Sequence, residues 1–107
     1  MSVRVRKFSS VLKRINKLGD KAKRDYVRKC TREFIDCISE CAKNVIKGNV
    51  PLTSRQKTRL RRSRNELRAL SVKKTPLRKK RRILQKGGFL GALLPPVLEV
   101  LANLLLE

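Results

Sequence analysis

The feature that most limits how this chain can fold is a dense run of positive charge in its middle. Between residues 41 and 98 there are 17 Lys and Arg but a single acidic residue, Glu66. Repulsion among so many like charges destabilises a compact state unless a polyanion neutralises them. A nucleic-acid backbone is the partner that this tract predicts, because each neutralised phosphate releases counterions.

The composition of the chain indicates how it is expected to contact a nucleic acid. The 107 residues have a formal net charge of +21, a value typical of histones, ribosomal proteins, viral core proteins and cationic membrane peptides. Aromatic residues make up only 4% of the chain, which is too few for a protein that binds single strands by stacking bases. We therefore expect contacts with phosphates that tolerate any base sequence.

The spacing of apolar residues predicts a small all-α domain with one long central amphipathic helix. This helix is expected over residues 20–47, because apolar positions recur there at steps of three and four. Gly48 and Asn49 close it, and Pro51 prevents its continuation. The apolar stripe consists of Tyr26, Val27, Cys30, Phe34, Cys37, Ile38, Cys41 and Val45.

Shorter helices are predicted on both sides of the central one. Ser9 and Ser10 can cap a helix that ends at Gly19. A capping box formed by Thr53 and Gln56 predicts a third helix, which runs to about residue 72 with a thin apolar stripe.

A fourth helix begins at Thr75 as cap and Pro76 as first helical residue, and it ends at Gly87-Gly88. No strand pattern is present, and a histone-like packing of the helices is one arrangement that this order allows.

The composition changes abruptly at Phe89, so we divide the chain into a basic helical DNA-binding domain, residues 1–88, and an apolar tail, residues 89–107. Pro95-Pro96 is expected to break the tail, leaving a helix from Val97 onward. These prolines and Glu99 argue against a transmembrane helix. An element that is apolar nearly all round must be buried, either in the core of the domain, in an oligomer or at a membrane interface.

The basic tract supplies the candidate nucleic-acid-binding residues. Lys and Arg on several faces of the predicted helices suit charge neutralisation and bridging between DNA segments better than reading of one groove. A solvated surface and a polybasic membrane-binding segment are the alternatives. The candidates are Arg55, Lys57, Arg59, Arg61, Arg62, Arg64, Arg68, Lys73, Lys74, Arg78, Lys79, Lys80, Arg81, Arg82 and Lys86.

The sequence contains no pattern that indicates a catalytic site, a metal site or a cofactor. The chain has no His, which removes the commonest general base and metal ligand. Its three cysteines, Cys30, Cys37 and Cys41, lie on the predicted apolar stripe and are expected to be buried as small hydrophobic side chains. We therefore expect no catalytic residues, no metal site, no cofactor and no enzymatic activity.

Residues 79–95 resemble a known family. A basic block, then Gly87-Gly88-Phe89-Leu90, then an apolar segment rich in Ala, Leu and Pro resembles the adenovirus core protein X, precursor of the mu peptide. The run is most similar to the X-like proteins of adintoviruses and of Maverick/Polinton DNA elements. The resemblance implies a virion core protein that condenses double-stranded DNA, found in the virion core and the host nucleus. It also implies cleavage by a viral cysteine protease at glycine-containing sites, here Gly87 and Gly88.

These observations predict sequence-independent binding and condensation of double-stranded viral DNA. Two other functions stay open at this stage. One is a membrane-active viral peptide that acts through the apolar tail, which could also mediate self-association. The other is an RNA-binding or ribosome-associated basic protein, because positive charge alone does not distinguish RNA from DNA.

Overall fold

The computed structural model describes residues 3–106 of the chain, and it describes side chains for residues 3–103. The regular structure in this part is helical. No strand occurs in this part, so the all-α prediction is confirmed. The finer prediction of a histone-like packing stays a prediction. The helices are α1 (Val3–Lys7), α2 (Ser9–Asn16), α3 (Asp20–Lys29), α4 (Arg32–Ile46), α5 (Ser54–Arg61), α6 (Arg64–Ser71), α7 (Leu77–Leu84) and α8 (Phe89–Leu106).

The predicted long helix over residues 20–47 is wrong, because it is divided into α3 and α4. Cys30 has extended backbone angles, φ −72° and ψ 162°, which stop α3. The hydroxyl oxygen of Thr31 then accepts a hydrogen bond from the Phe34 N–H at 3.2 Å and caps α4. A Thr cap satisfies a backbone donor that a new helix leaves free, so it stabilises a start at this point.

The capping box at Thr53 is confirmed. The Gln56 N–H donates to Thr53 Oγ1 at 3.1 Å, and the Thr53 N–H donates to Gln56 Oε1 at 2.9 Å. The predicted third helix is nevertheless divided into α5 and α6, with Ser63 outside helical geometry at φ −109° and ψ 25°. The Ser63 N–H donates to Leu60 O at 3.0 Å, a three-residue step that tightens the end of α5 before α6 begins.

The predicted start of the fourth helix differs from the observed one by a single residue. α7 begins at Leu77 with Pro76 as the residue before it, one position later than expected. Gly88 has φ +81°, a conformation that favours glycine, and it forms the turn between α7 and α8.

The predicted break at Pro95-Pro96 is wrong, because α8 runs through both prolines. Each proline removes a backbone donor and costs about 3 kcal/mol inside a helix. Leu93, Leu94 and Val97 are fully buried, as is Leu101. Burial of one such side chain stabilises by about 1.5–3 kcal/mol, so four of them can offset both prolines.

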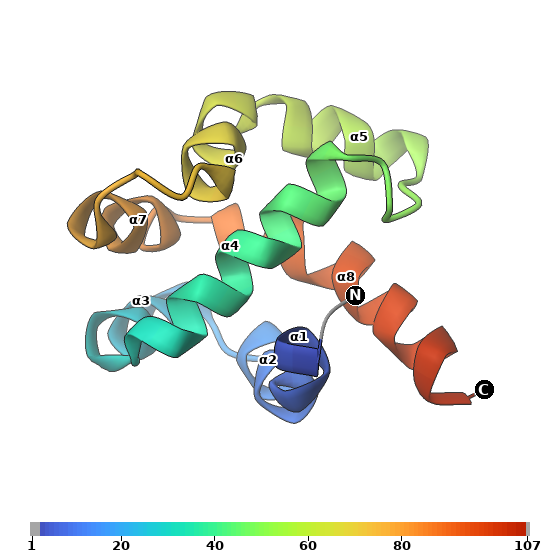
Figure 1. The fold of residues 1–107 in the computed structure, drawn as a ribbon, viewed down its shortest axis with the longest axis horizontal. Coiled ribbons are helices and arrows are strands. Elements are labelled where there is room, and N and C mark those ends of the chain that lie inside the picture. The colour runs from blue at the N-terminus through green and yellow to red at the C-terminus, as the bar shows by residue number, and fades with distance from the viewer. Residues whose placement is uncertain (1–2, 107) are drawn as a thin grey trace.

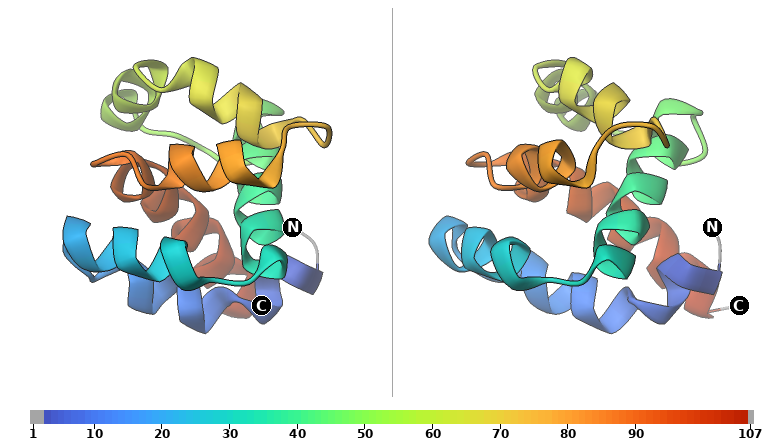
Figure 2. Two further views of the ribbon diagram at one scale, coloured as in Figure 1. Left: turned by 90° about the vertical axis from the view of Figure 1, so that its left-hand side faces the viewer. Right: turned by 60° about the vertical axis from the view of Figure 1, so that its left-hand side comes forward.

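α4 runs through the centre of the molecule and packs against α1, α6, α7 and α8 (Figure 1). α8 also packs against α2 and α5, and α3 packs against α7. The views in Figure 2 show α6, α7 and α3 in succession along one side of α4. The radius of gyration, 12.7 Å, is close to the value of about 13 Å expected for a folded chain of about 100 residues.

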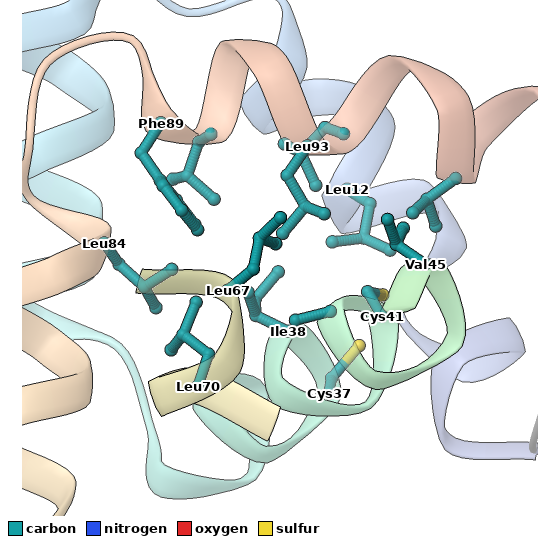
Figure 3. Packing of buried hydrophobic residues seen from close by; sticks show 14 of the residues in the cluster. Leu12, Cys37, Ile38, Cys41, Val45, Leu67, Leu70, Leu84, Phe89 and Leu93 are labelled. Carbon is teal, nitrogen blue, oxygen red and sulfur yellow. The ribbon is translucent and has the colours of Figure 1, made fainter. Parts of the chain in front are cut away.

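The core joins the two ends of the sequence. Ile38 from α4, Leu67 from α6 and Leu93 from α8 point toward one another in Figure 3, with Leu12 of α2 beside them. The apolar side chains of α8 therefore belong to the same buried cluster as those of the basic segment that precedes it. Within the described residues, no helix combines the length and the apolar character needed to cross a bilayer.

Candidate nucleic-acid interface

The structure places thirteen of the fifteen predicted cations on the surface. They are Arg55, Lys57, Arg59, Arg61, Arg62, Arg64, Arg68, Lys73, Lys74, Arg78, Lys79, Arg82 and Lys86. Two residues differ: Lys80 is buried, and Arg81 is half-buried. Among the residues that the structure describes, Lys86 is the one member of the fifteen that pairs with a carboxylate.

Arg81 has an internal partner. Its Nη1 donates to the carbonyl oxygen of Val27 at 2.8 Å and lies 3.4 Å from Cys30 Sγ. The last carbonyls of a helix have no donor within the helix, and a basic side chain near them is favourable. Arg81 therefore ties α7 to the end of α3, and its Nη1 is not free for a phosphate.

Lys80 points away from the exposed side of α7. Only 6% of its surface is accessible, and it lines a cavity between α7 and α4. The sequence contained a signal for both exceptions. Positions 80 and 81 follow Leu77 and precede Leu84 at steps of three and four, so they lie on the buried stripe of the helix.

The exposed side of α7 brings four predicted cations together. A shallow groove of about 500 Å³ is lined by Pro76, Arg78, Lys79, Arg82, Ile83 and Lys86. The Lys86 ammonium lies 3.0 Å from Glu66 Oε1, and its hydrogen bond lowers the pKa of that carboxyl. Arg78, Lys79 and Arg82 lie on α7 and Lys86 lies just after its end. The four side chains can contact successive phosphates, and all but Lys86 lack a carboxylate partner among the described residues.

A second cationic groove lies between α5 and α6. Lys57, Arg61, Arg64 and Arg68 surround a space of about 270 Å³. Its floor is apolar and is formed by Val45, Ile46, Leu52, Leu60 and Leu67. Long basic side chains can cover such a floor with their methylene stems while the charged ends stay in water.

Lys23 was not among the predicted cations, although it lies beside one of them, Arg59, in the structure. A methyl group at Gly91 of α8 would lie 3.4 Å from Arg59 Nη2 and 3.6 Å from Lys23 Nζ. The ends of Arg59 on α5 and Lys23 on α3 thus both lie beside the first turn of α8. No sequence pattern links positions 23, 59 and 91, because only the tertiary packing brings them together.

The remaining predicted features lie apart from these grooves. Lys73 and Lys74 are exposed in the loop between α6 and α7, and Gly87 is exposed in the turn before α8. Gly88 is half-buried. The described residues contain no group of three or more His, Cys, Asp or Glu that could hold a metal.

The cysteines are free thiols. Cys37 and Cys41 are fully buried, as expected for small hydrophobic side chains, whereas Cys30 is half-buried. A hydrogen bond with Cys37 and burial both raise the pKa of Cys41. Burial likewise raises the pKa of Cys30, although Arg81 opposes this shift. Thiols held in the neutral form are poor nucleophiles and poor metal ligands.

Comparison of this chain with protein-family models, with curated proteins and with solved structures found no match.

Proposed function

We propose that this protein binds double-stranded DNA without sequence preference and condenses it. The observation that carries the proposal is the exposure of thirteen predicted cations over α5, α6, the following loop and α7, with few carboxylates nearby. An exposed and largely unpaired cation can neutralise a phosphate and release its counterion. Contacts with phosphates alone carry no direct sequence information.

The geometry supports condensation rather than reading of a single site. The α7 groove and the α5–α6 groove each contain four cations and belong to different helices. A protein with cations on more than one face can contact two DNA segments at once. The basic helices α5, α6 and α7 are eight residues long, so each makes only about two turns.

The resemblance of residues 79–95 to adenovirus core protein X supports a place in a virion core, and with it the host nucleus. Under this proposal a viral cysteine protease cuts at Gly87-Gly88. In the turn between α7 and α8, Gly87 is exposed and Gly88 is half-buried, an arrangement that supports access to the Gly87 side of this site. After cleavage α8 would stay attached, because Phe89, Leu93 and Val97 are buried in the common core.

The membrane-active alternative is less well supported. Among the described side chains of α8, Phe89, Leu90, Leu93, Leu94, Val97 and Leu101 are buried in the core. α8 packs against α2, α4 and α5, so it would first have to leave the core to place these side chains in a bilayer. The RNA-binding alternative rests on the same positive charge as the DNA proposal and is an outcome of the test below.

The proposal is tested by gel-shift measurements with several unrelated duplexes over a range of salt concentrations. With six to ten phosphate contacts, affinity should fall by about 10³–10⁵ between about 50 and 200 mM salt. Affinities for the different duplexes should agree closely at each salt concentration. Affinity that does not change with salt, or strong preference for one duplex, would overturn the proposal. Competition with RNA of equal length decides between the two nucleic acids.

A further inference from the structure

A cavity of about 370 Å³ lies apart from the two exposed grooves, between α1, α4, the α6–α7 loop and α7. Among the residues that the structure describes, its wall contains five cations from four different parts of the chain. They are Arg4, Arg32, Lys43, Lys73 and Lys80. Such a gathering is not produced by one basic segment, because Arg4 and Lys80 are far apart in sequence.

Lys80 distinguishes this cavity from the exposed basic grooves, because its side chain is buried. It is only 6% exposed, yet its side chain forms no hydrogen bond or ion pair with any residue that the structure describes. In that same part of the chain, no side-chain nitrogen or oxygen is sealed from solvent without a partner. The Lys80 ammonium therefore opens into the cavity that it lines. Removing an ammonium from bulk water without a partner is unfavourable, which favours a bound anion.

The balance of charge in the cavity is positive. Asp36 and Glu40, one turn apart on α4, also line it. Five cations and two carboxylates leave an excess of three positive charges. The carboxylates offset part of the cationic wall, and the excess is available to a ligand of opposite charge.

The hydroxyl groups show where a ligand can receive hydrogen bonds. The Ser39 hydroxyl already donates to Ile35 O at 2.9 Å, and the Ser71 hydroxyl donates to Arg68 O at 2.8 Å. The Thr75 hydroxyl has no partner among the described residues and faces the same cavity. The side chains of Thr75 and Lys80 are thus free donors among the described lining residues, and the exposed Arg32 can add a bidentate contact.

The volume of the cavity and the residues that line it indicate which class of ligand fits. The volume is within the range of about 300–1,000 Å³ that small-molecule sites have. Leu77 is the apolar residue of the lining, and no aromatic side chain is present to stack on a ring. A compact anion with several charged oxygens fits better than a nucleoside or a hydrophobic ligand.

We propose that this cavity binds a phosphate group, with Lys80 as the central ligand. The group could come from a free polyphosphate or from DNA, and the two sources share the same chemistry. The proposal stands apart from the DNA-binding function, because it concerns a built pocket rather than the exposed cations.

The test uses the whole chain and tripolyphosphate as the probe. Calorimetry in about 0.3 M salt suppresses diffuse binding to the surface. Lys80→Met retains an unbranched side chain and removes the charge, and Lys79→Met removes the same charge from the exposed side of the same helix. We expect saturable binding of one ion per chain, weakened about tenfold or more by Lys80→Met. Lys79→Met should bind like the unmodified chain.

Circular dichroism and thermal unfolding check that Lys80→Met folds. If it does not, Arg32→Gln, with Arg24→Gln on α3 as the matched control, replaces it in the same comparison. Absence of saturable tripolyphosphate binding by the unmodified chain would overturn the proposal, as would equal losses in the variant and its matched control.

Duplex-DNA affinity of the same proteins identifies the source of the phosphate. If a DNA phosphate enters the cavity, Lys80→Met weakens DNA binding more than Lys79→Met does. If the ligand is free phosphate, Lys80→Met loses tripolyphosphate binding while its DNA affinity is no lower than that of Lys79→Met. Both outcomes support the cavity, and neither depends on the DNA proposal being correct.

Discussion

Arg81 and Arg82 are neighbours with different roles, although their sequence context is the same. Arg81 donates to Val27 O and holds α7 to α3, whereas Arg82 is exposed in the α7 groove. A sequence reading treats both as phosphate ligands. The distinction arises because position 81 lies on the buried stripe of α7 and position 82 does not.

Substitution of these two residues should therefore separate stability from DNA binding. Arg81→Ala should lower the free energy of unfolding by about 1.5–3 kcal/mol, since it removes a hydrogen bond from a charged donor. Arg82→Ala should change it by less than about 0.5 kcal/mol and should reduce the salt dependence of DNA binding by about one phosphate contact. Urea unfolding and gel shifts measure the two effects. Equal destabilisation by both substitutions would contradict the assigned roles.

The ion pair between Lys86 and Glu66 makes a small contribution that depends on pH. The hydrogen bond from Lys86 lowers the pKa of Glu66 in the folded state. The stabilisation is therefore present above the usual carboxyl pKa and is lost as the pH falls through the lowered value. Glu66→Gln should destabilise by about 0.2–1 kcal/mol near pH 7, as is typical of partly exposed pairs. The difference from the unmodified chain should disappear in strongly acidic solution, and a difference that grows there would contradict this account.

The boundary between α3 and α4 shows what sequence periodicity can and cannot predict about an element. The apolar stripe from Tyr26 to Val45 faces the core: α4 buries all of its members, and α3 buries Val27 and half-buries Tyr26. The interruption at Cys30 does not disturb the spacing, so the pattern alone implies one helix. The Thr31 cap was the available local signal. A similar limit applies to α8, where proline chemistry predicts a break and burial of its leucines prevents it.

Loss of the Thr31 cap should weaken the start of α4. Thr31→Ala leaves the Phe34 N–H without its side-chain acceptor and should lower the free energy of unfolding by about 1 kcal/mol. Thr58→Ala is the matched control, because Thr58 is an exposed threonine in the interior of α5. Chemical unfolding of both variants measures the difference. A larger loss from Thr58→Ala would show that the Thr31 cap does not define this boundary.

At the scale of the whole molecule, the sequence predicted the chemistry of the surface better than its shape. Exposure follows from charge, so most of the predicted cations are where they were expected. Their grouping into two grooves, the approach of Lys23 to Arg59, and the cavity around Lys80 depend on how the helices pack. Contacts between residues so distant along the chain leave no local pattern.

The arrangement also explains how so basic a chain can fold. Apolar side chains from α2, α4, α6 and α8 form one cluster, and the cations of α5, α6 and α7 are exposed around it, except Lys80 and Arg81. Self-repulsion of the exposed charge opposes this compact state, and a bound polyanion relieves the repulsion. We accordingly expect DNA to be a ligand that stabilises the fold as well as a substrate for condensation.

The most direct measurement is the slope of log affinity for duplex DNA against log salt, compared between two variants of equal charge. One variant carries Arg78→Gln, Lys79→Gln and Arg82→Gln in the α7 groove. The other carries Lys13→Gln, Lys17→Gln and Lys21→Gln, which lie outside both grooves. We predict that the first variant has a slope shallower by about 0.9 for each lost phosphate contact, and that the second changes it less. Equal changes in both variants, or no change in the first, would contradict a DNA interface on the exposed side of α7.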